Sequence, residues 1–189
     1  MRAPAVVRAL LLGTLAAIVL GCGGGGGGNE SVVPRLMCSG ATSPAPDQVT
    51  LGCPAEGIDS ITVAVHLGGP TTSSDIYGLK FDLVFDPTVL QFEPPAMEGS
   101  FLNRDGAATI LQAGISQAEP GRLIVAITRQ GAPAGLQAAG TDQVVMTLLF
   151  RGVTAGSTTL VFENAAVIDS NLQTIQAIGF GAPLTLTFN

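Results

Sequence analysis

The sequence predicts an all-β domain, built as a sandwich of two sheets and preceded by a flexible tether. From residue 58 to residue 189, short apolar runs with a period of two are separated by clusters of Gly, Pro, Asn and Asp. This pattern is typical of half-buried strands joined by turns. No amphipathic helix of convincing length interrupts it. About eight or nine strands, each with one face to bury, indicate two packed sheets.

The alternation is clearest in two segments. Residues 61–67 place Ile61, Val63, Val65 and Leu67 on one face, and residues 79–85 place Leu79, Phe81, Leu83 and Phe85 on one face. Further strands are expected at residues 89–92, 109–115, 122–129, 143–151, 157–162, 165–168 and 182–188. Residues 130–142, which are rich in Gly and Pro, are expected to form the longest internal loop.

The N-terminus has the features of a secretory signal peptide over residues 1–21. Arg2 and Arg8 are followed by an uncharged apolar run over residues 9–20, which is shorter than the ~20 residues that a spanning helix needs. The junction Val19-Leu20-Gly21-Cys22 resembles the bacterial lipobox, which implies a diacylglycerol on the Cys22 thiol and a stable acyl anchor. Because aspartate is absent from position 23, the resemblance implies an outer-membrane or cell-surface address. An ordinary signal peptide with a chance cysteine is the alternative.

Charge and composition exclude two classes of protein. The predicted signal peptide holds two of the eight basic residues and no acidic residue, so its removal changes the net charge from −6 to −8. Nucleic acid is therefore not an expected partner. With 47% hydrophobic and 12% charged residues, the chain is not disordered over most of its length.

Residues 22–57 are predicted to be the tether. A pure glycine run over residues 23–28 is followed by a stretch rich in Pro, Ser, Gly and Thr without sustained apolar periodicity. Cys38 and Cys53 lie in this stretch, and export to an oxidising compartment favours a disulfide between them. Two thiols alone are too few ligands for the alternative, a zinc site. The bridge is expected to stiffen a small loop and to contribute little to the sandwich.

Residues 78–92 have the sequence GLKFDLVFDPTVLQF, in which a strand ends in an aromatic-Asp-Pro turn and a Val-Leu pair follows. This segment resembles a signature of cohesin domains, and residues 121–129, 144–150 and 165–171 resemble later strands of that family in order. The resemblance covers residues 58–189. It implies a nine-stranded jelly-roll sandwich related to carbohydrate-binding modules, which grips a dockerin module on another exported protein. It also associates the chain with polysaccharide breakdown.

Enzyme activity is not expected, and the sequence assigns no catalytic residue, cofactor or metal. His66 is the only histidine, and alternation places it on the polar face of its strand, where a solvated role is expected. Neither a Gly-x-Ser-x-Gly elbow nor a His-Glu-x-x-His helix is present. The acidic residues are scattered through loops, where turn chemistry explains Asp86 and the Asp169-Ser170-Asn171 segment. A calcium site at the latter is the alternative.

One face of the predicted sheet has the composition of an interface. If Leu123, Val125 and Ile127 point toward the core, the residues between them point to solvent. They then lie beside the solvent-facing residues of the 79–85 strand. An apolar centre rimmed by charge is what a protein interface requires, and the cohesin resemblance implies that this sheet meets the partner. The predicted partner-binding residues are Lys80, Asp82, Val84, Gln112, Ile124, Ala126 and Thr128. The alternative is that a loop or the tether covers this face.

These observations together predict a membrane-anchored, extracytoplasmic binding protein. Polysaccharide binding is a second hypothesis, but the chain has no Trp and only Tyr77 for stacking on sugar rings, so a flat sugar-binding platform is not expected. A shallow sugar site built on loops, and a purely structural lipoprotein, stay open as alternatives.

Overall fold

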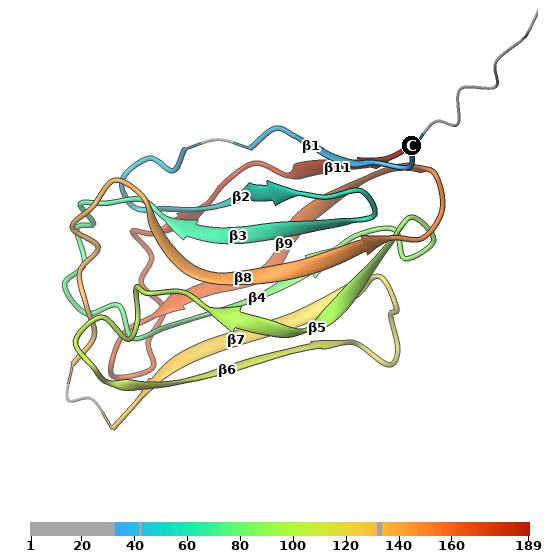
Figure 1. Cartoon of the computed structure of the whole chain (residues 1–189). Coiled ribbons are helices and arrows are strands. Elements are labelled where there is room, and N and C mark those ends of the chain that lie inside the picture. Colours follow the sequence, from blue (N-terminus) through green and yellow to red (C-terminus); the bar gives the residue numbers. More distant parts are fainter. Residues whose placement is uncertain (1–32, 42, 132–133) are drawn as a thin grey trace, which may run out of the picture. The chain divides into compact units, whose positions relative to one another are not determined.

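The computed structural model describes residues 33–41, 43–131 and 134–189, and these residues form a β-sandwich (Figure 1). The predicted signal peptide, Cys22 and the glycine run lie outside the described residues. Within the described part of the chain all eleven regular elements are strands, and no helix there is long and apolar enough to cross a membrane. The predicted all-β fold class is confirmed.

Six strands form one sheet and five form the other. The six-stranded sheet has the order β1 (Leu36–Ser39), β11 (Leu184–Phe188), β9 (Gly156–Ile168), β4 (Gly78–Val84), β7 (Arg122–Gln130), β6 (Ala108–Ile115). The five-stranded sheet has the order β10 (Gly179–Phe180), β2 (Gln48–Glu56), β3 (Ser60–Leu67), β8 (Gln143–Gly152), β5 (Leu90–Glu98). All neighbours are antiparallel except β10 and β2. The two segments expected as separate strands at 157–162 and 165–168 belong to the single strand β9, which pairs with β4 across a register shift.

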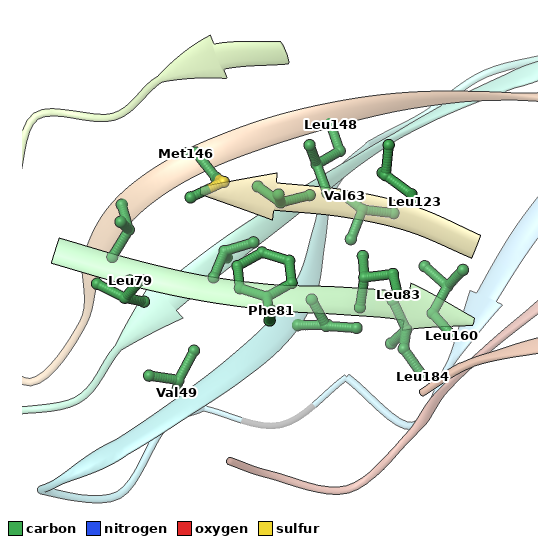
Figure 2. Close-up of a cluster of buried hydrophobic side chains, with 14 of the residues drawn as sticks. Val49, Val63, Leu79, Phe81, Leu83, Leu123, Met146, Leu148, Leu160 and Leu184 are labelled. Atoms are coloured by element: carbon green, nitrogen blue, oxygen red, sulfur yellow. The ribbon is translucent and has the colours of Figure 1, made fainter. Parts of the chain in front are cut away.

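The core lies between the two sheets and consists of the side chains that alternate toward the inside of each strand. Side chains of β4 and β7 meet those of β2, β3 and β8, as Figure 2 shows for Phe81, Leu123, Val63 and Leu148. The inward residues predicted for β3, β4 and β7 are all buried. Fully burying each such side chain contributes about 1.5–3 kcal/mol, so this shared core is the main source of stability.

The predicted boundary between tether and domain is wrong, because the sandwich begins well before residue 58. Leu36 of β1 and Val49 of β2 are completely buried in the core. Strand β1 pairs with β11, and β2 pairs with β3. The sequence hides both strands, since β1 has only four residues and β2 contains Gly and Pro around a register shift.

The predicted disulfide between Cys38 and Cys53 is confirmed, but its role differs from the expectation. The two Cα atoms lie 6.5 Å apart, with Cys38 in β1 and Cys53 in β2. These strands belong to different sheets, so the bridge fastens one sheet to the other instead of closing a loop within a tether.

A candidate protein-binding face

The seven predicted partner-binding residues lie on the outer face formed by β4, β7 and β6. The antiparallel register places Lys80 opposite Ala126 and Asp82 opposite Ile124, while Ala126 also faces Gln112 on its other side. Lys80, Ile124, Ala126 and Gln112 are exposed, whereas Asp82, Val84 and Thr128 are half-buried. Their outward orientation therefore agrees with the alternation argument, and their role in binding stays a prediction.

The centre of this face is apolar. Ile124 is 51% exposed and Ile110 is 40% exposed, which are large fractions for isoleucine in a folded sheet. Gly114 lies opposite Ile124, and a Cβ added to Gly114 would meet nothing within 4 Å. Ile110 was missed in the sequence analysis, although it has the same parity as Gln112 on the same strand.

Arg122 organises the charged rim beside Ile124. Its guanidinium donates from Nε to Glu119 Oε2 at 2.6 Å and from Nη1 to Asp82 Oδ2 at 2.9 Å, and it forms a 2.8 Å ion pair from Nη2 to Glu163 Oε2. Asn164 Nδ2 also donates to Asp82 Oδ2 at 2.7 Å. The hydrogen bonds to Glu119, then to Glu163 and Asp82, raise the pKa of Arg122 further above its ordinary value.

These bonds hold the charged rim in place in the unbound domain. The rim is also acidic. Three carboxylates, from Asp82, Glu119 and Glu163, share the Arg122 guanidinium, and Lys80 is a second cation on this face. From the sequence, Asp82 is predicted to be one of the charged residues around the apolar centre. The structure shows that Asp82 is held by Arg122 and Asn164, because strand pairing brings β4, β7 and β9 together.

His66 lies on the outer face of the other sheet and is not part of this surface. Its Nδ1 lies 2.5 Å from Asp142 Oδ1, and its side chain is 14% exposed beside Gly52. The expected solvated role is therefore wrong, because the ring is mostly covered and paired. A cavity of about 340 Å³, which Ser43 and Cys53 also line, adjoins the pair.

Two aspartates act as the turn chemistry predicted. Asp169 Oδ1 accepts the backbone N–H groups of Asn171 at 2.9 Å and Gln173 at 2.8 Å. Asp86 Oδ1 accepts the backbone N–H and the hydroxyl of Thr88, and these bonds lower the pKa of Asp86. No group of three or more metal-ligating side chains occurs within the described ranges.

The comparisons with solved structures identify the fold. The second type II cohesin module of the adaptor scaffoldin of Acetivibrio cellulolyticus is 19% identical and superposes with a TM-score of 0.57, covering 72% of this chain and 86% of that one. A type II cohesin domain from the cellulosome of the same organism is 16% identical, with a TM-score of 0.56 over 75% and 95% of the two chains.

A third structure, a type II cohesin–X-dockerin complex from that organism, is 18% identical with a TM-score of 0.53, covering 71% and 96%. No family model and no curated protein matches the sequence. The described domain has the fold of cohesin modules, and the resemblance found in the sequence is confirmed at that level.

Proposed function

We propose that this domain is a protein-binding module, and that the outer face of β9, β4, β7 and β6 docks a dockerin-type module carried by an exported partner. The observation that carries the proposal is the half-exposed Ile124 at the centre of this face, bordered by the ordered Arg122 network. Hot spots of protein interfaces are apolar anchors enclosed by polar residues that exclude water. One of the structures that share the fold is a cohesin–dockerin complex, which supports a partner of this kind.

The proposal assigns binding and no catalysis. The exposed large apolar side chains of the described residues include no aromatic ring, whereas sugar-binding surfaces stack pyranose rings on aromatic side chains. A protein partner is therefore favoured over a polysaccharide. The acidic rim favours a partner surface that presents an apolar ridge with lysine or arginine beside it.

The proposal includes export and anchoring. Acylation of Cys22 would hold the domain at the outer membrane or the cell surface. The domain would then immobilise its partner at that surface.

The test is affinity capture on the immobilised protein from the exported proteins of the source organism, run beside a panel of polysaccharides. Binding of a purified dockerin-bearing protein from the eluate, measured again by calorimetry, would support the proposal. Retention on a glycan without protein binding would support the sugar-binding hypothesis. Failure of both would indicate a structural lipoprotein.

A further inference from the structure

The two sheets have four edge strands, and three of them are protected against pairing with another chain. Strand β1 has four residues and β10 has two. Strand β5 contains Pro94 and Pro95 between Glu93 and Glu98, with a register shift. Short edges, prolines, charges and irregular register are the usual devices that prevent edge pairing.

Strand β6 has none of these devices. It is the eight-residue edge of the six-stranded sheet, along the bottom of the domain in Figure 1. Residues 106–118 contain no charged side chain and no proline, although the chain as a whole has a net charge of −6. A long, regular and uncharged edge presents a row of free backbone donors and acceptors.

The hydrogen bonds of the β6–β7 hairpin show which backbone groups are free. The N–H of Ser116 donates to the carbonyl of Arg122 at 2.8 Å, next to the pair formed by Ile115 and Leu123. In an antiparallel ladder, alternate residues bond to the neighbouring strand, so the even-numbered residues of β6 bond to β7. The backbone groups that point to the free edge belong to Thr109, Leu111, Ala113 and Ile115, and none of them has another hydrogen-bond partner within the described residues.

A second copy of β6, placed antiparallel to the first, can pair its own free backbone donors and acceptors with these groups in one register. Thr109 pairs with Ile115 of the second copy and Leu111 with Ala113 of the second copy, and the reciprocal pairs follow by symmetry. Each of these pairs exchanges two backbone hydrogen bonds. Gln112 lies on the two-fold axis opposite Gln112 of the second copy. Such an isologous contact closes on itself and gives a dimer.

Charge and burial favour a second copy as the occupant. Two acidic molecules repel each other over most of their surfaces, but neither carries a charge along β6. The Glu98 carboxylate accepts the Thr109 hydroxyl at the start of β6, so its charge lies near the end of the paired segment and not at the two-fold axis. Leu111 and Ala113 pack on the core while staying partly exposed, and pairing across the edge would cover them.

We propose that two copies of the chain join edge to edge through β6, with the two-fold axis at Gln112. The two six-stranded sheets then form one continuous sheet. Because directly opposite residues share a face, the two candidate binding faces lie side by side on the same side of that sheet. The dimer is bivalent, and two linked sites bind a multivalent partner more tightly than one site does. This proposal stands whether or not the partner is a dockerin.

The experiment is sedimentation equilibrium on the purified full chain over a wide range of concentrations. Gln112 is exposed on the outer face, so Gln112→Glu and Gln112→Lys leave the fold intact. Each variant places two like charges opposite each other across the axis and should weaken the dimer at least tenfold, which is roughly 1.4 kcal/mol. An equal mixture of the two variants should restore the dimer, because it places opposite charges across the axis.

Gly114→Ala is the uncharged control on the same strand, because a Cβ there meets nothing within the chain and the Gly114 N–H bonds to β7. In the dimer this alanine faces Ile110 of the second copy, which is an ordinary cross-strand pair without a charge. This variant should dimerise like the original chain. Hydrogen exchange gives a second readout: the amides of Thr109, Leu111, Ala113 and Ile115 should gain protection as the concentration rises. A chain that stays monomeric at every concentration would overturn the proposal, as would Gln112→Glu and Gln112→Lys dimers that are as tight as the original.

Discussion

Replacing Ile124 with Asp is the sharpest test of the candidate binding face. Fully burying an isoleucine side chain contributes about 1.5–3 kcal/mol, and Ile124 is 51% exposed. A partner that covers it therefore gains about 1 kcal/mol from this side chain. An aspartate at this position loses that apolar contribution to binding. It also places an additional carboxylate opposite Asp82, and the desolvation of this carboxylate by the partner, together with like-charge repulsion, costs several kcal/mol. We expect binding to weaken by about 3 kcal/mol or more, which is at least roughly a hundredfold change in Kd.

The assay is calorimetric titration with the partner, accompanied by thermal unfolding of the domain. The unfolding temperature should fall by only about a few degrees, because Ile124 points away from the core and the main cost to the free domain is the like-charge pair with Asp82. Leu149→Asp is the matched control, since Leu149 is 40% exposed on β8 of the other sheet, and this variant should bind normally. Lys80→Ala should change binding less than Ile124→Asp does. It should act mainly through a salt-dependent association rate, which should rise because the expected partner surface is basic.

Two results would refute this reasoning. If Ile124→Asp unfolds the domain, the side chain supports the core and the assignment of the face is reversed. If the variant folds and binds normally, the interface lies elsewhere, and the loop at residues 130–142 is the next region to test.

Three further predictions concern the anchor, the bridge and one ion pair. Replacing Cys22 with Ser should release the protein from the membrane fraction or block its processing, and unchanged fractionation together with an unchanged N-terminal peptide mass would contradict acylation. Replacing both Cys38 and Cys53 with Ala should lower the free energy of unfolding by about 3 kcal/mol, measured by urea titration, since the bridge closes a loop of 15 residues between two sheets. Nonreducing peptide mapping of the exported protein should show the linked pair, and two free thiols would refute it. Hydrogen bonding to Arg129, a buried residue, lowers the pKa of Asp105 from 3.8 to about 2. The contribution of this hydrogen bond to the free energy of unfolding is therefore fully present above about pH 4 and is lost as the pH falls through about 2. Asp105→Asn should remove this part of the acid dependence in urea midpoints measured at several pH values, and an unchanged acid dependence would show that the pair does not couple to folding.

The sequence alone determined the fold class and the two sides of the central strands. Alternation with a period of two is a local property, so residues 79–85 and 122–129 revealed which side chains face the core without knowledge of their neighbours. The disulfide partners followed as well, because only two cysteines remain once Cys22 is assigned to the anchor.

The tertiary structure alone decided which strands become neighbours. Arg122 meets Asp82 and Glu163, each about forty positions away in the chain, because β7 and β9 both flank β4. The sequence of β1 has no alternating pattern that predicts a strand. It forms a strand because it pairs with β11 at the edge of the sheet. Pairing between distant strands depends on how the whole core packs, and the local periodicity of the sequence does not specify that packing.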